Sequence, residues 1–197
     1  MQRSIAFFDF DGTITTRDTF LEIIRYTKGE LRFAAGFALM SPWIAAMKLK
    51  LISNSDAKQR VMRHFFGGTP VDQFRQQCED FVHRKLPNLI RPGALRQIDE
   101  YRKQGAEIVV VSASPEFVVA PWCNLHQLSC IGTRLEVKDG LITGNIEGKN
   151  CYGPEKVARI QERFDVGLFG EIHAYGDSSG DKAMLDMATT AHYKPFR

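Results

Sequence analysis

Residues 4–13 have the sequence SIAFFDFDGT, and the interpretation of the whole chain starts from them. The run from Ser4 to Phe8 is almost entirely apolar, which is typical of a strand buried on both faces of a parallel sheet. Asp9 and Asp11 follow at its carboxyl end, and Gly12 marks the turn after them. Because neighbouring residues of a strand point to opposite faces, the two carboxylates point the same way. Ligands of open α/β sheets bind at this end of the strands, so we expect a binding site there.

The carboxylates of Asp9 and Asp11 predict a cation beside them. Carboxylates held close together repel each other unless a cation or a shared proton relieves the repulsion. A hard divalent ion that takes oxygen ligands, such as Mg²⁺, is the natural partner. A structural alternative stays open, because Asp-Gly is also common turn chemistry and an aspartate can simply cap a helix.

Three later segments resemble the first strand and predict its neighbours in a parallel sheet. They are Glu107–Val111, Leu128–Ile131 and Ile172–Tyr175. Segments with apolar residues at helical spacing alternate with them: 92–104, a helix that starts at Ser114, and a helix opened by Gly153-Pro154. Pro121 is expected to break or kink the second of these helices. Strands that alternate with helices predict an α/β fold, a three-layer Rossmann-like parallel sheet.

The segment after the first strand breaks this alternation and predicts an inserted domain. It contains no strand-like run, whereas apolar residues at helical spacing follow Ser55-Asp56 and Thr69-Pro70. We therefore expect an all-helical cap at residues 16–86, inserted into a core made of residues 1–15 and 87–197. Later in the chain, alternation around Asp139-Gly140 predicts a hairpin.

Length and composition limit the class of protein. A chain of 197 residues with 44% hydrophobic and 25% charged residues indicates one globular domain, or one domain that carries a sizeable insert. The formal net charge of +3 is too small to indicate a nucleic-acid partner. Four scattered cysteines without a C-x-x-C pair, and an N-terminus without a signal-peptide pattern, predict a reduced, cytoplasmic protein.

The longest uncharged stretch, from Phe33 to Met47, lies within the predicted cap. It is shorter than the ~18 residues that a membrane-spanning helix needs, and it contains a glycine and a proline, so we expect a buried helical hairpin. A weak membrane-surface contact is the alternative, because Trp43, Lys48 and Lys50 form an aromatic and basic edge.

A second acidic motif, YGDSSGD, occupies residues 175–181 after the last predicted strand. Asp177 and Asp181 flank a loop of glycine and serine that leads into a helix, so one carboxylate lies at the strand end and the other in the first helical turn. The structural alternative is that both acids only stabilise the helix N-terminus through its dipole.

Two further positions are candidates for binding an anion. Ser112 follows the strand-like run 107–111, and a hydroxyl at a strand end beside free helix N–H groups can bind phosphate. Ser114 in the same segment is also an ordinary helix cap. Lys156 lies in the first turn of the helix after Gly153-Pro154, where a lysine opposes the helix dipole, and a nearby anion would explain it. A solvated surface lysine is the alternative.

Taken together, these motifs resemble those of the haloacid dehalogenase superfamily of phosphotransferases. The motifs that match are DFDGT (9–13), VVVSAS (109–114), GPEKV (153–157) and GDSSGD (176–181). The match covers nearly the whole chain, and the first and last motifs are highly specific. The helical insert after the first motif resembles the small cap of the phosphoserine-phosphatase branch.

This resemblance implies a mechanism and a set of site residues. Asp9 would be the nucleophile that forms an aspartyl-phosphate, and Asp11 would protonate the leaving alcohol and later activate water. The residues that hold Mg²⁺ would be Asp9 and Asp177 through their side chains and Asp11 through its backbone carbonyl. The phosphoryl oxygens would be bound by Ser112, Ala113 and Lys156. Asp181 would orient Lys156 or a water molecule.

Three departures from the phosphoserine pattern put that particular substrate in doubt. Asp18 stands where such relatives usually carry Glu near the substrate amine, Ala113 where they often have Gly, and Gly180 where Asn is common. With Thr19, Asp18 could also simply cap the first helix of the insert. We expect a small phosphorylated substrate.

The same residues suggest two other functions. A lipid head-group phosphatase, similar to phosphatidylglycerophosphatase and acting at the membrane surface, is the alternative. A phospho-acceptor signalling module is disfavoured, because such switches lack a cap and lack an acid two residues after the nucleophile. The sequence is silent on the oligomeric state.

Overall fold

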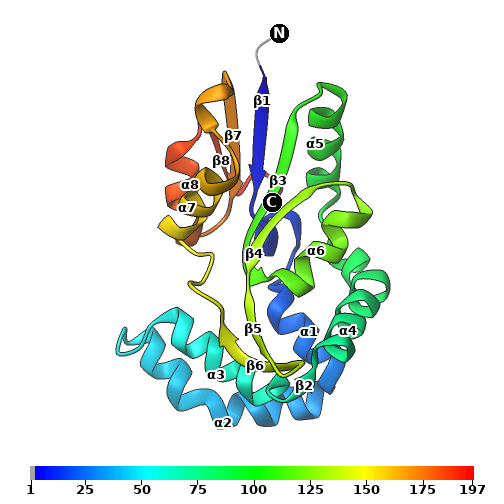
Figure 1. Cartoon of the computed structure of the whole chain (residues 1–197), viewed down its shortest axis with the longest axis vertical. Helices are drawn as coiled ribbons and strands as arrows, with labels where there is room; N and C mark the ends of the chain where they lie inside the picture. Colours follow the sequence, from blue (N-terminus) through cyan, green and yellow to red (C-terminus); the bar gives the residue numbers. More distant parts are fainter. Residues whose placement is uncertain (1–2) are drawn as a thin grey trace.

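The computed structural model describes residues 3–197, and its centre is a five-stranded sheet in the order β4-β3-β1-β7-β8 (Figure 1). All four neighbouring pairs of strands are parallel. The strands are β1 (Ser4–Phe8), β3 (Glu107–Pro115), β4 (Ser129–Thr133), β7 (Glu171–Gly176) and β8 (Thr190–Tyr193). The predicted α/β class with a parallel sheet is confirmed. The edge strand β8 is absent from the prediction, because its sequence TAHY has no apolar run.

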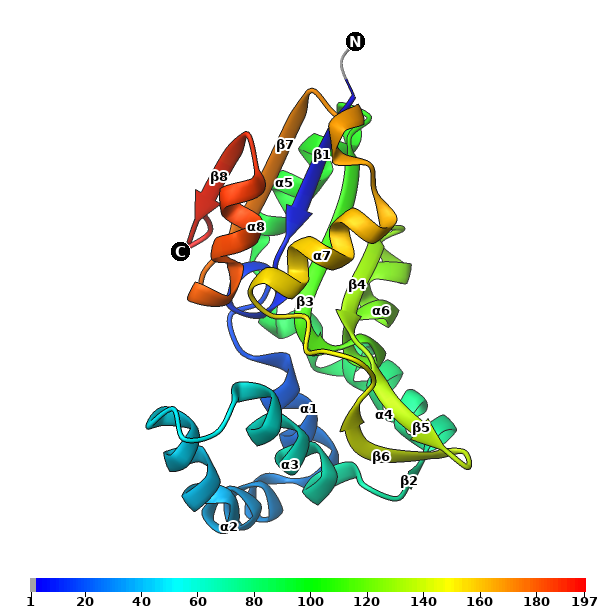
Figure 2. The same ribbon diagram turned by 60° about the vertical axis from the view of Figure 1, so that its left-hand side comes forward.

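Helices cover both faces of this sheet, which gives three layers (Figure 2). Alternation along β1 sends Ile5 and Phe7 to one face and Ala6 and Phe8 to the other, into two separate hydrophobic clusters. The first cluster includes residues of α7 and α8, and the second includes residues of α5 and α6. These helices are α5 (Pro92–Lys103), α6 (Glu116–Leu125), α7 (Pro154–Arg163) and α8 (Lys182–Met187). Because Phe7 and Phe8 are completely buried, each contributes about 1.5–3 kcal/mol to folding.

Short helical turns connect several of these elements. They are Phe10–Ile14, Leu86–Leu89, Val166–Leu168 and Ser179–Asp181. The helix α6 differs from the prediction in two ways. It begins at Glu116, so that Ser114 belongs to β3 and does not cap it, and it continues through Pro121.

Four further helices lie outside the three-layered core, at the lower end of the molecule in Figure 1. They are α1 (Thr19–Lys28), α2 (Glu30–Lys48), α3 (Asn54–Phe66) and α4 (Val71–Arg84). Local sequence explains where two of them begin. The Asp18 carboxylate accepts a hydrogen bond from Leu21 N at 3.0 Å, and Ser53 and Asp56 form a reciprocal capping box.

The expectation that residues 16–86 are all-helical is wrong in one respect. Residues Thr69–Pro70 form a two-residue strand, β2, that pairs antiparallel with β6 (Leu141–Ile146). The strand β6 pairs in turn with β5 (Leu135–Lys138), and this predicted hairpin is closed by Asp139 and Gly140, both with positive φ, as a two-residue turn requires. A strand of two residues leaves no periodicity in the sequence. We keep residues 16–86 as the proposed cap, to which the hairpin 135–146 adds two strands.

The predicted buried hairpin at 33–47 is also wrong. The segment is part of one continuous helix, α2, which passes through Pro42, and Gly36 is its only buried residue. In the part of the chain that the structure describes, no helix combines the length and the apolar character needed to cross a membrane.

Candidate active site

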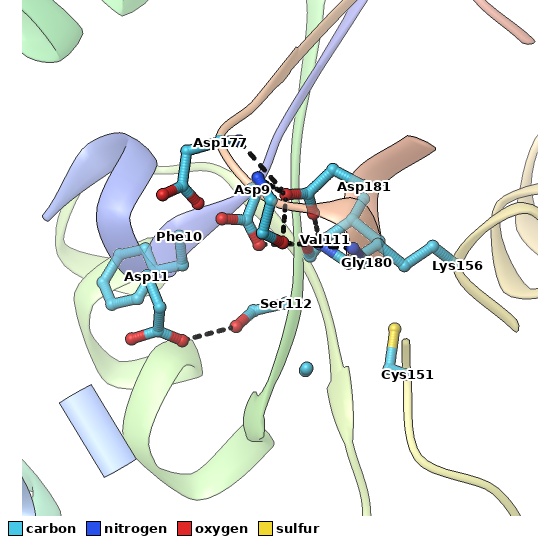
Figure 3. A network of polar contacts seen from close by, with 12 residues as sticks. Asp9, Phe10, Asp11, Val111, Ser112, Cys151, Lys156, Asp177, Gly180 and Asp181 are labelled. Carbon is cyan, nitrogen blue, oxygen red and sulfur yellow. Dashed lines mark hydrogen bonds and ion pairs between the residues drawn. The ribbon is translucent and has the colours of Figure 1, made fainter. Parts of the chain in front are cut away.

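The candidate site is a pocket of about 380 Å³ at the carboxyl ends of β1, β3 and β7. Asp9 continues β1, Ser112 lies near the end of β3, Asp177 follows β7, and Lys156 projects from the first turn of α7 (Figure 3). The cap closes the other side, since Arg17, Asp18, Asn54 and Lys58 also line the pocket. Parallel strands end at the same edge of a sheet, which is why motifs far apart in the sequence meet here.

Lys156 is the centre of a buried ionic network. Its ammonium donates to Asp9 Oδ1 at 2.6 Å, to Asp181 Oδ1 at 2.7 Å and to the Val111 carbonyl at 2.7 Å. The lysine is only 1% exposed. Burial by itself would lower the pKa of Lys156, but the two carboxylates outweigh burial and raise it well above its usual value. The alternative of a solvated surface lysine is therefore wrong.

The negative charge of Asp9 is only partly neutralised in the folded protein. Burial is the main cause that raises the pKa of Asp9 to about 7, with further repulsion from Asp181 and Asp11. Lys156 opposes this rise but does not cancel it, because its single charge is shared between Asp9 and Asp181. A second cation near Asp9 would favour its ionised form.

Three carboxylates lie where such a cation would bind. Oxygen atoms of Asp9, Asp177 and Asp181 all lie within 4.8 Å of one another. Burial, followed by the charge of Asp181, raises the pKa of Asp177. An all-carboxylate donor set with this unrelieved repulsion fits Mg²⁺, which prefers oxygen ligands. Gly12 is required beside it, because its φ is +80° and a Cβ there would lie 2.5 Å from Asp177 Oδ2.

The three carboxylates are not equally free to bind a metal. Besides Lys156, Asp181 accepts hydrogen bonds from the backbone N–H groups of Asp177 and Ser178, at 3.1 and 2.9 Å, and from the Ser178 hydroxyl at 2.9 Å. Among the described residues, the Asp177 carboxylate forms one ion pair, with Arg197. The geometry thus leaves Asp9 and Asp177 as the more available ligands, while Asp181 holds the lysine and the loop.

The Asp11 side chain lies apart from this cluster (Figure 3). Its Oδ1 accepts hydrogen bonds from the Thr19 backbone N–H and hydroxyl, both at 2.6 Å, and its Oδ2 accepts one from the Ser112 hydroxyl at 3.1 Å. Thr19 is the first residue of α1, so Asp11 connects the core to the start of the cap. This arrangement fixes the Asp11 carboxylate at the wall of the pocket.

Of the remaining predicted residues, Ala113 and Asp18 line the pocket, whereas Ser112 lies behind its wall. Ser112 is fully buried, and its hydroxyl accepts a hydrogen bond from Ser114 N at 2.9 Å. Ala113 lines the pocket, and its carbonyl accepts hydrogen bonds from Lys58 and Thr133. Asp18 lines the rim and caps α1 at the same time, so both of its predicted roles are compatible with its position.

Lys58 is a site residue that the sequence analysis missed. It projects from α3. Its ammonium contacts the Ala113 carbonyl and lies 5.3 Å from the centre of the Phe20 ring. Burial lowers the pKa of Lys58, while Asp18 and Asp11 oppose that effect. Its local sequence resembles any lysine on an amphipathic helix, so no signal in the sequence distinguishes it. The sequence analysis also did not identify Arg17 and Asn54, which line the pocket.

The parallel sheet, with acidic residues at the ends of β1 and β7, defines a hydrolase of the haloacid dehalogenase-like class. The family model described as haloacid dehalogenase-like hydrolase matches residues 6–186, so the chain belongs to this family. The predicted resemblance is confirmed, and the chain is an enzyme of the hydrolase class.

Similar proteins include several with phosphatase names. Protein CicA of Caulobacter vibrioides is 37% identical over 194 residues, which are 96% of this chain and 85% of that protein. Phosphoserine phosphatase of Methanocaldococcus jannaschii is 27% identical over 194 residues, 95% of this chain and 83% of that protein. A solved structure described as a phospho-aspartyl intermediate analogue of phosphoserine phosphatase has a TM-score of 0.64 at 22% identity, and covers 97% of this chain and 86% of its own. The last similarity shows the fold.

Proposed function

We propose that this protein is a Mg²⁺-dependent phosphomonoesterase that works through an aspartyl-phosphate on Asp9. The observation that carries this proposal is the buried Asp9 carboxylate, which Lys156 holds at 2.6 Å within a cluster of three acids. The phosphatase names of its relatives support the same reaction class. We place the enzyme in the cytoplasm, which suits its four free cysteines.

The reaction has two steps. In the first, an Asp9 oxygen attacks phosphorus, the bond from phosphorus to the leaving oxygen breaks, and Asp11 gives its proton to the departing alkoxide. In the second, Asp11 takes a proton from water, the water oxygen attacks phosphorus, and the acyl-phosphate bond breaks to release inorganic phosphate and Asp9. Ser112, the backbone at Ala113, and Lys156 orient the phosphoryl oxygens. When bound, Mg²⁺ offsets the repulsion between the carboxylates and the phosphoryl group.

The pocket also narrows the substrate class. On the cap side, Lys58, Arg17 and Asp18 line the pocket, so two positive charges stand there against one negative charge. We infer that the alcohol part of the ester carries a negative charge, as in phosphoserine or a lipid phosphate with a second phosphate group. An alcohol part with an amine alone, as in histidinol phosphate, would be repelled. Phosphate release from these three esters in the presence of Mg²⁺ tests both the reaction and this preference.

Mg²⁺ removal should abolish phosphate release, and re-addition should restore it. We further expect Asp177→Asn to weaken Mg²⁺ binding at least about tenfold, because it removes a charged ligand. Isothermal titration calorimetry measures this binding without substrate. Asp186→Asn, an exposed change on α8, is the matched control. Mg²⁺ binding by Asp177→Asn as tight as that of the wild type would show that Asp177 is not a metal ligand.

Asp11→Asn should reduce turnover of alkyl phosphates by about 10²–10⁴-fold, because the leaving alkoxide loses its proton donor. For an aryl phosphate the loss in the first step should be much smaller, since a phenolate leaves without a proton. The phosphoenzyme should then accumulate, because Asp11 no longer activates water. Acid-quenched phosphoprotein measures this accumulation. An equal loss in the rate of phosphoenzyme formation from both ester types would contradict the assignment of Asp11 as the general acid.

The signalling alternative differs in the lifetime of the phosphoenzyme. A phospho-acceptor module would keep its phosphoryl group after incubation with acetyl phosphate. We expect wild-type protein to lose it within the time of a turnover, while Asp11→Asn retains it.

A further inference from the structure

We propose that α2 and the turn after it form a docking surface for a membrane that contains anionic lipid. The surface, which we call the apolar ridge, consists of large apolar side chains that remain exposed in the folded protein. They are Leu31, Leu39, Trp43, Leu49 and Leu51, with exposures of 88, 62, 40, 71 and 73%. Figures 1 and 2 place α2 at the end of the molecule farthest from the N-terminal end of the sheet.

The helix contacts the cap through a narrow strip. The ring of Phe33 packs at a tilt against that of Phe37, and Phe37 stacks on Phe65 of α3. Gly36 allows this approach, because a Cβ there would lie 2.3 Å from the Phe65 ring. Although α2 carries apolar residues around its whole circumference, Gly36 is its only fully buried residue. A helix with apolar residues on every side normally has partners on every side, so the outer face of α2 lacks a partner among residues 3–197.

The charges around the ridge identify the partner. The stretch 31–55 contains no Asp or Glu, whereas Arg32, Lys48 and Lys50 are basic. The Arg60 guanidinium lies 3.8 Å from the centre of the Trp43 ring, which adds a fourth positive charge at the ridge. An apolar surface with basic residues at its edge and a tryptophan among them matches the interface of an anionic bilayer. Two copies of the same basic surface would repel each other, which disfavours a dimer through α2.

The ridge ends beside the active site. Leu49 and Leu51 lie in the turn before α3, and Asn54, the first residue of that helix, lines the pocket together with Lys58. A protein docked through this turn would therefore bring its pocket close to lipid head groups. The docking does not depend on the proposed function. The inference that a lipid phosphate is the substrate, however, rests on the proposed function.

Co-sedimentation of the full chain with vesicles tests the docking. We expect binding to vesicles of phosphatidylcholine mixed with phosphatidylglycerol, and much weaker binding to pure phosphatidylcholine. The double change Lys48→Glu with Lys50→Glu should lower the partition coefficient on anionic vesicles by on the order of tenfold or more, because it replaces attraction with repulsion. Leu49→Ser with Leu51→Ser should lower it on both vesicle types, because less apolar area is buried.

The matched control is Leu125→Ser with Leu168→Ser, two leucines that are 56 and 62% exposed on other parts of the molecule. Hydrolysis of a soluble phosphate ester should be unchanged in all these variants, so that a failure of docking and a failure of the proposed function are separate results. The proposal is overturned if wild-type protein binds no vesicle, or if the control loses as much binding as the ridge variants. A dimer in sedimentation velocity that Leu39→Ser dissociates would overturn it in favour of self-association.

Discussion

Asp9→Asn should lower phosphate release from every ester at least about 10³-fold, while the protein stays folded. The amide is a poor nucleophile, so the aspartyl-phosphate does not form. The fold tolerates the change, because Lys156 keeps its contacts with Asp181 and with the Val111 carbonyl. Burial already raises the pKa of Asp9, so its charge is costly to the folded state and its loss removes that cost.

Steady-state phosphate release and thermal unfolding measure the two halves of this prediction. Asp165→Asn is a suitable control, since that aspartate lies at a remote turn where it caps Val166–Leu168. Wild-type turnover by a folded Asp9→Asn protein would end the proposed mechanism. An unfolded variant would instead show that the ion pair is needed for stability, and Asp9→Glu would then test the nucleophile.

Lys156→Met should destabilise the protein by about 3–5 kcal/mol in the absence of Mg²⁺. Asp9 and Asp181 are only 6 and 1% exposed, and the change leaves both without their shared cation. Two buried carboxylates that face each other without a positive charge are the costly case for ion pairs. Turnover should be lost as well, because the same ammonium orients the phosphoryl group. Urea unfolding measures the loss of stability.

Lys182→Met provides the control, since that lysine pairs with Asp186 on the surface and should change stability by less than about 1 kcal/mol. Added Mg²⁺ should recover part of the stability of Lys156→Met, because it supplies positive charge to the same carboxylates. A loss below about 1 kcal/mol in Lys156→Met without Mg²⁺ would contradict the central role of this network.

Much of the core fold could be predicted because its signals are local. The apolar runs at residues 4–8 and 107–111 have the length and continuity of buried strands, and both are strands of the sheet. The alternation around Asp139-Gly140 marked a hairpin correctly, since its two turn residues adopt the positive φ values that this dipeptide favours. By contrast, β2 and β8 are defined by their pairing partners, and their own residues carry no comparable pattern.

The environment of α2 shows a different limit of prediction from sequence. Its apolar composition predicts burial, because composition reports what a segment prefers to contact. Which contacts exist depends on the neighbours that the rest of the fold supplies, and here α1 and α3 cover one strip only. The same holds for Lys58, whose residue type is ordinary and whose position over the pocket depends on how the cap sits on the core.

By itself, the amino-acid sequence determined the parallel α/β core and the acids near its strand ends, since hydrophobic periodicity and the spacing of Asp9 and Asp11 are properties of short segments. Only the tertiary structure decided that Lys156 reaches Asp9 across 147 residues of chain and that Asp181 shares its charge. It also decided which face of the cap stays uncovered. The physical reason is that an ionic network or an exposed surface depends on distances between segments, which are set when all layers pack together.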